Sequence, residues 1–152
     1  MKRLVKAAII ASGLFLSSAV LASAGSVILD VTNISPQQIG VYGGPSCSGC
    51  TMQTTWSIPS YSSNVTMATA SSGATTMDYS IAYYANFKVD VFVVQKVCRA
   101  TIKLELDGNG NISRVAQYSW AVANSNPTCT TVTPPYVDVN GNVRWDVRYT
   151  AM

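Results

Sequence analysis

Apolar and polar residues alternate one by one along much of this chain. From 98 to 107, apolar Cys, Ala, Ile, Leu and Leu occupy every second position, with Arg, Thr, Lys, Glu and Asp between them. The segment 143–150 repeats the pattern with Val, Trp, Val and Tyr. Successive side chains of a β-strand point to opposite faces, so each segment predicts a strand with one buried and one solvated face. After residue 24 no segment keeps a 3.6-residue apolar period, so the predicted fold class is all-β.

Short strands separated by turn residues are expected throughout the rest of the chain. They are predicted at 27–32, 39–42, 52–58, 64–70, 75–84, 87–94, 98–107, 112–122 and 143–150. Because no crossover helices separate them, these strands favour an antiparallel β-sandwich of about eight or nine short strands. A small β-barrel is the alternative architecture.

Two turns rich in Gly and Asn predict tight hairpins. The apolar residues that flank the first turn can both face the core only if 108–110 form a three-residue loop, with Gly110 in the left-handed conformation. The same parity argument makes 140–142 a second such loop, with Asn142 in the left-handed conformation.

The first hairpin also predicts a register for the strands beside it. Counting outward from its loop places Cys98 opposite Trp120, a small residue facing a large one, which suits an interior pair. The same count places Arg114 opposite Leu104 on the inward face. We therefore expect Arg114 to lie at the periphery of the sheet.

The first 24 residues have the three parts of a secretory signal peptide. Lys2, Arg3 and Lys6 precede an apolar run, which ends in the small residues at 22–24. A transmembrane anchor is the alternative, but Ser and Gly residues interrupt the run and leave it short of the roughly 20 apolar residues that a spanning helix needs. We expect 1–24 to be a cleaved signal peptide and 25–152 a single exported domain, periplasmic or extracellular.

Cleavage changes the charge balance of the chain. It removes three of the ten Lys and Arg residues and none of the seven Asp and Glu residues, which leaves seven of each sign. A neutral chain lacks the basic surface on which nucleic-acid binding depends. It also lacks the polybasic cluster that attaches proteins to anionic membranes. We expect no nucleic-acid partner and no stable membrane insertion.

Four cysteines follow the leader: Cys47, Cys50, Cys98 and Cys129. An even number in an exported chain predicts two disulfides, for which three pairings are possible. We favour Cys47 with Cys50, in a Gly-rich loop, and Cys98 with Cys129, which a turn after the 112–122 strand would return to the sheet of Cys98. The rival pairing joins Cys50 to Cys98. A redox or zinc role for the CxxC is disfavoured, because no helix follows it and no second close pair of cysteines exists.

The inventory of catalytic groups is small. The chain has no histidine, which removes the commonest general base and metal ligand. Asp107, Asn109 and Asn111 have the spacing of the first ligands of a calcium loop, but the later Gly and Glu positions of that loop are Ile112 and Tyr118. We expect no metal, no cofactor and no catalytic residues.

Polar residues and tyrosines dominate the faces that alternation assigns to solvent. The predicted binding patch consists of Tyr42, Tyr61, Tyr83, Tyr84 and Tyr136. Tyrosine is frequent where one end of a side chain is apolar and the other is wet. Three sequons, at Asn33, Asn64 and Asn111, matter only in a host that glycosylates.

These features favour an exported, disulfide-stabilised, non-enzymatic module for binding or surface assembly. Its partner would be a protein, a glycan or a second copy of the chain. One alternative is an exported enzyme that uses a carboxylate pair or the CxxC. Another is a small outer-membrane β-barrel, whose lipid-facing residues would also alternate.

Overall fold

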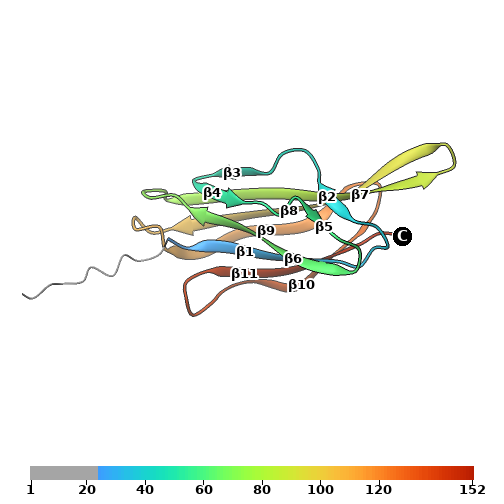
Figure 1. The fold of residues 1–152 in the computed structure, drawn as a ribbon. Helices are drawn as coiled ribbons and strands as arrows, with labels where there is room; N and C mark the ends of the chain where they lie inside the picture. Colours follow the sequence, from blue (N-terminus) through green and yellow to red (C-terminus); the bar gives the residue numbers. More distant parts are fainter. Residues whose placement is uncertain (1–23) are drawn as a thin grey trace, which may run out of the picture.

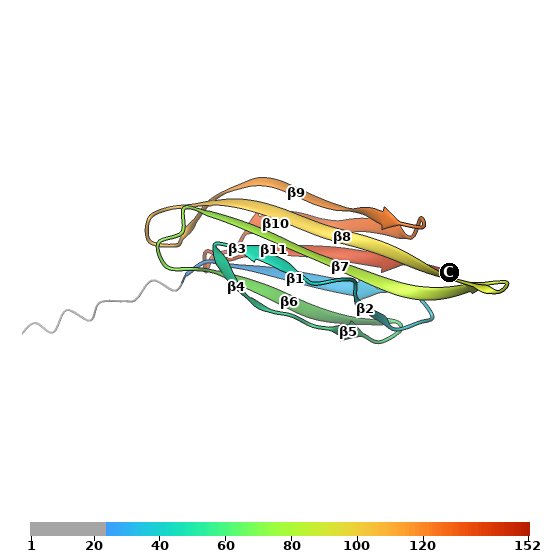
Figure 2. The same cartoon turned by 90° about the horizontal axis from the view of Figure 1, so that it is seen from above.

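The computed structural model describes residues 24–152, so the predicted signal peptide lies outside the described residues except for Ala24. Sheet A has the strand order β10 (Thr128–Val137), β11 (Val143–Thr150), β1 (Ser26–Asn33), β6 (Ser62–Ala70), β4 (Cys50–Gln53). Sheet B has the order β5 (Ser57–Ile58), β2 (Ile39–Val41), β7 (Thr76–Val89), β8 (Phe92–Leu106), β9 (Ile112–Asn124), and β3 (Ser46–Ser48) also pairs with β7. The two sheets lie face to face (Figure 1, Figure 2). The predicted all-β sandwich is confirmed.

β1 is a central strand of sheet A. It pairs in parallel with β11, so that Leu29 lies beside Trp145, and antiparallel with β6. The other ladders are antiparallel, as predicted. Strands from the two ends of the described chain are therefore neighbours.

Segment 87–94, predicted as one strand, instead contains the end of β7, a turn and the start of β8. Val89 pairs with Phe92, which leaves Asp90 and Val91 as a two-residue turn. Asp90 has a φ of 55°, and aspartate tolerates this left-handed region better than most residues. The prediction is wrong because an Asp-Val turn lacks the glycine that usually marks a tight hairpin in a sequence.

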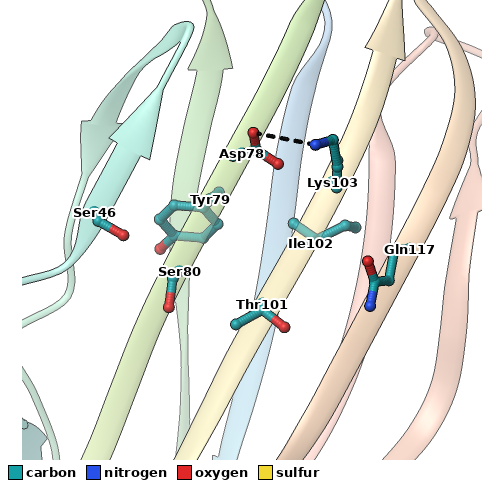
Figure 3. A pocket seen from close by; sticks show the side chains of 8 residues that line it. All are labelled: Ser46, Asp78, Tyr79, Ser80, Thr101, Ile102, Lys103 and Gln117. Carbon is teal, nitrogen blue, oxygen red and sulfur yellow. Dashed lines mark ion pairs between the residues drawn. The ribbon is translucent and has the colours of Figure 1, made fainter.

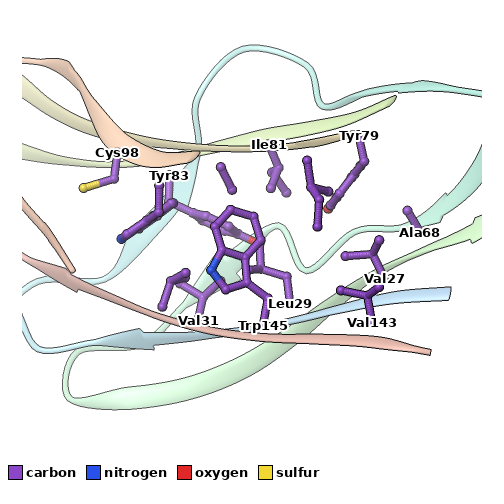
Figure 4. Packing of buried hydrophobic residues seen from close by; sticks show 14 of the residues in the cluster. Val27, Leu29, Val31, Ala68, Tyr79, Ile81, Tyr83, Cys98, Val143 and Trp145 are labelled. Atoms are coloured by element: carbon purple, nitrogen blue, oxygen red, sulfur yellow. The ribbon is translucent and has the colours of Figure 1, made fainter. Parts of the chain in front are cut away.

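The inward faces of the two sheets interlock in the core (Figure 4). Trp145 of β11 is 1% exposed and packs among side chains of both sheets. The hydroxyl groups of the buried tyrosines find partners: Tyr83 donates to the carbonyl of Thr55 at 2.9 Å, and Tyr149 donates to that of Lys96 at 2.7 Å. The alternation predicted for β8 and β11 is thus an alternation between core and solvent.

Two of the three register shifts along the β8–β9 ladder change the predicted register of the first hairpin. Each inserts one extra residue into β9, which reverses the faces of the side chains that follow. Arg114 therefore pairs with Glu105 on the solvated face and forms an ion pair with its carboxylate. Trp120 pairs with Ala100, so the predicted pairing of Trp120 with Cys98 is wrong.

The two predicted turns share the sequence Asp-x-Asn-Gly-Asn, at 107–111 and 138–142. In each, one carboxylate oxygen of the Asp accepts hydrogen bonds from the backbone N–H groups two and four residues later, at 2.8–3.0 Å. Gly110 and Gly141 have φ values of 83° and 78°. The predicted 140–142 loop is wrong by one residue: Val137 pairs with Val143 and the Asp138 N–H bonds the Asn142 carbonyl, so the loop is 139–141. The left-handed position therefore falls on Gly141, which has no Cβ to clash, and not on Asn142 as predicted.

Each disulfide joins one sheet to the other. Cys47 on β3 of sheet B bonds Cys50 on β4 of sheet A, and Cys98 on β8 of sheet B bonds Cys129 on β10 of sheet A. The favoured pairing is confirmed. Cys129 does not return to the sheet of Cys98 as predicted, because the chain crosses to sheet A at 125–126, where both residues have positive φ.

Replacing Trp145 with aspartate should unfold the protein under mild conditions. The substitution leaves a cavity and buries an unpaired charge, and we expect a loss of about 3 to 5 kcal/mol or more in the free energy of unfolding. Arg148→Ala, three residues along the same strand on the solvated face, should change it by less than about 0.5 kcal/mol. Similar urea midpoints for the two variants would contradict the assignment of faces in β11.

The two disulfides should differ in their contribution to stability. Cys98 and Cys129 are 31 residues apart, and closing such a loop contributes about 3 to 4 kcal/mol by the chain-entropy estimate. The three-residue separation of Cys47 and Cys50 gives about half of that. Urea unfolding should therefore show a larger loss for the Cys98→Ala/Cys129→Ala variant than for Cys47→Ala/Cys50→Ala, and the reverse order would contradict the estimate.

Candidate functional site

A polar depression of about 340 Å³ lies on the outer face of sheet B (Figure 3). Three hydroxyl groups form one row across it, because Ser46 pairs with Ser80 and Ser80 pairs with Thr101. In the next row, Lys103 Nζ lies 3.8 Å from Asp78 Oδ2, and both side chains are about half exposed. This surface can exchange hydrogen bonds with a polar ligand. It contains a single carboxylate, which is already paired with a lysine.

Two neighbouring carboxylates, of the kind that the enzyme alternative requires, lie on sheet A. Asp30 of β1 and Asp146 of β11 are register partners. Burial raises the pKa of the Asp30 carboxyl, and the negative charge of Asp146 raises it further. Asp30 Oδ1 is buried and has no hydrogen-bond partner among the described residues. The pair nevertheless occupies one row of one sheet face, whereas the carboxylates of a glycosidase flank the substrate from two sides.

The CxxC and the calcium-like spacing have structural roles in the observed fold. Cys47 and Cys50 lie on strands and form a disulfide, without the helix N-terminus that activates a redox thiol. Asp107 caps the backbone of a hairpin turn. Within residues 24–152, no group of three or more His, Cys, Asp or Glu side chains is placed to hold a metal ion.

The five tyrosines of the predicted patch do not share one surface. Tyr42 and Tyr84 meet edge to face on sheet B, with ring centroids 5.8 Å apart. Tyr61 is 68% exposed just before β6, and Tyr136 is 48% exposed on β10, in the other sheet. Tyr83 is 0% exposed, because it occupies an inward position of β7. A binding role remains a prediction for Tyr42 and Tyr84. Tyr83 is buried, so its side chain cannot contact a ligand at the surface.

A second, smaller depression lies beside Tyr84. It measures about 210 Å³, and the side chains of Gln37, Gln38 and Asn86 contribute amide groups to its lining. An aromatic ring with nearby amides can stack on a ligand and hydrogen-bond it. The Tyr42 and Tyr84 pair is the part of the predicted patch that the fold brings together.

The three sequons are in different environments. Asn33 is 0% exposed, and its amide nitrogen donates to three backbone carbonyl groups at 2.8–3.3 Å. It is a structural residue that ties β1 to the loops beside it. Asn64 and Asn111 are exposed, and the Asn111 amide hydrogen-bonds the Asp107 carboxylate.

The tip of the β7–β8 hairpin, residues 87–94, extends beyond the rest of the sandwich (Figure 1); we call it the arm. Its apolar side chains are largely exposed, with exposed fractions of 53% for Val89, 88% for Val91, 71% for Phe92 and 61% for Val93. β7 and β8 have 14 and 15 residues, whereas β1 and β11 have 8 each. The arm therefore continues past the end of the opposite sheet, which cannot cover it.

No protein-family model matches the chain, and a search of curated proteins finds no similar sequence. Among residues 24–152, no helix is long and apolar enough to cross a bilayer.

Sequence reasoning missed the arm and the Asp30–Asp146 pair. A signal for the arm was present, because Val91, Phe92, Val93 and Val94 are consecutive apolar residues and cannot all face the core of a half-buried strand. No comparable signal marks the acidic pair. Its two members are 116 residues apart in the sequence and meet only because β1 and β11 are parallel neighbours.

Replacing Asp30 with asparagine should stabilise the fold at neutral pH. The folded-state pKa of Asp30 lies above its ordinary value of 3.8, so the ionised carboxylate costs the folded state free energy that a neutral amide does not. This cost disappears as the pH falls through the raised pKa to below the ordinary value, where both states bind the proton. The denaturant midpoint of Asp30→Asn should exceed that of the parent at about pH 7 and match it near about pH 3. An equal or lower midpoint at neutral pH would contradict this account of the acidic pair.

Proposed function

We propose that this chain is an exported, non-enzymatic module that binds a protein partner through the arm. The observation that carries the proposal is the exposure of Val89, Val91, Phe92 and Val93 together at one tip. Contiguous exposed apolar patches are uncommon on soluble proteins and mark interaction sites. The cores of protein interfaces are depleted of charge and enriched in aromatic side chains, and Phe92 is the aromatic residue of this tip.

The arm is also suited to binding because it is ordered before any partner arrives. The β7–β8 ladder is unbroken from Thr76 and Glu105 out to Val89 and Phe92. At its base, Lys96 Nζ lies 4.6 Å from the centre of the Phe87 ring. A preorganised hairpin loses little conformational entropy when it docks, so more of its contact energy contributes to affinity.

The charges around the arm favour a protein over a lipid surface. Lys88, Lys96 and Asp90 are the ionisable residues of the segment 86–97, so the excess positive charge is one. Stable attachment to an anionic membrane needs clusters of roughly four to eight basic residues. The apolar tip with nearly balanced charge fits an apolar groove on a protein.

Export is the other part of the proposal. The leader-like 1–24 segment supports it, and so do the two disulfides, which persist in oxidising compartments. The absence of histidine from the sequence and the scarcity of charge, 11% of residues, favour binding over catalysis.

Site-specific crosslinking in the native host tests the arm. A photoreactive amino acid at Val91 should capture a discrete protein, because this side chain is 88% exposed at the tip. The matched control is Val139, which is 101% exposed at the turn between β10 and β11, at the other end of the molecule (Figure 1). We expect no adduct from position 139 and loss of the position 91 adduct in Phe92→Asp, whose unfolding midpoint should be unchanged.

Three results would overturn the proposal. Equal adducts from positions 91 and 139 would show collision rather than binding. Adducts with lipid from position 91 would show that the arm enters a membrane. An adduct that survives Phe92→Asp would show that the apolar tip does not hold the partner.

A further inference from the structure

β9 is an edge strand whose outer side is open. Within the described residues it pairs only with β8, along 13 residues from Ile112 to Asn124. Its other edge therefore presents backbone N–H and C=O groups that no strand satisfies. An open edge of this kind is a template for another strand.

The other edges of the two sheets are short or interrupted. β3, β4 and β5 have 3, 4 and 2 residues. β10 is long, but its ladder to β11 has two register shifts, and it contains Pro134 and Pro135, which cannot donate to a neighbouring strand. Natural proteins protect their edges by such means.

β9 has little of this protection between Gln117 and Val122, where no register shift interrupts its ladder with β8. Both bulges near its start lie before Gln117, and from Gln117 to Val122 the ladder with β8 keeps one register. No charged residue occurs from 115 to 127, so the edge lacks the lysines that usually block strand addition. The regular segment is thus both open and neutral.

Two half-exposed apolar side chains flank the middle of this segment. Trp120 is 7% exposed and donates its indole N–H to the Arg148 carbonyl at 3.0 Å. Two residues away on either side, Tyr118 is 44% exposed and Val122 is 47% exposed. All three share one face of β9, because strand side chains repeat every second residue.

We propose that β9 is the site at which a second copy of this chain adds, antiparallel, to form a two-fold dimer. A symmetry axis at Trp120 places Tyr118 of each copy opposite Val122 of the other, an aromatic and β-branched pair that stabilises antiparallel strands. On the opposite face the same axis places Ser119 against Ala121. No pair brings like charges together. Sheet B of one copy and sheet B of the other then form one continuous sheet. The segment is therefore complementary to itself, so the strand that adds to the edge of β9 is β9 of a second copy.

The test is the oligomeric state of the purified protein with both disulfides intact, measured by sedimentation over a range of concentrations. The parent protein should form a dimer. Val122→Lys should be a monomer at the same concentrations, because the lysine would face Tyr118 without a partner for its charge. Thr101→Lys is the matched control: it adds the same charge to β8, one strand inward, where Thr101 is exposed, and it should stay dimeric.

A second measurement tests the register and does not depend on the lysine variant. Mixed Ser119→Cys and Ala121→Cys chains should form a disulfide-linked heterodimer faster than either variant links to itself, since the axis places these positions opposite each other. A monomeric parent, a dimeric Val122→Lys or preferential linkage of like positions would each overturn the proposal. Phe92→Asp should leave the dimer intact; a monomer in that variant would place the contact on the arm instead.

Discussion

The requirement that each sheet bury one face against the other is the constraint from which the rest of this structure follows. Trp145, at 1% exposure, lies in the interior where inward side chains of both sheets meet. Both disulfides act on the same contact, since each joins a strand of sheet A to a strand of sheet B. A small domain gains stability from such links, because they reduce the conformational freedom of its unfolded chain.

The parts of the sandwich that this constraint leaves uncovered are its candidate functional surfaces. β7 and β8 are longer than the strands of sheet A, so their shared tip becomes an exposed apolar arm. Among residues 24–152, β9 pairs with β8 alone, and its regular segment 117–122 carries no charge. The acidic pair on sheet A is different, because burial and the charge of Asp146 make the ionised form of Asp30 unfavourable in the folded protein. The proposed binding function rests on the arm, and the proposed dimer rests on β9.

Much of the fold could be predicted from the sequence, because alternation reports directly which side of a strand is buried. The sandwich and the buried Trp145 followed from parity. The favoured pairing of the cysteines is also correct, although the predicted return of Cys129 to the sheet of Cys98 is wrong. The errors arose where a single extra residue, or a turn without glycine, changes which side chains face the core. Neither feature is visible in the local sequence. The bulges in β9 moved Arg114 to the wet face, and the Asp90–Val91 turn divided a predicted strand. The site was less predictable, since exposure at the arm and the neighbours of β9 are properties of the assembled sheets.

The most direct test of this account is amide hydrogen exchange, measured on the isolated monomer and on the protein within its native assembly. Exchange is slowed where backbone groups become paired or buried. We expect added protection in the arm, 87–94, and in the regular edge segment of β9, 117–122, with no change across the polar depression around Ser80 and Thr101. Protection confined to that depression, or equal exchange in both samples at the arm and β9, would contradict it.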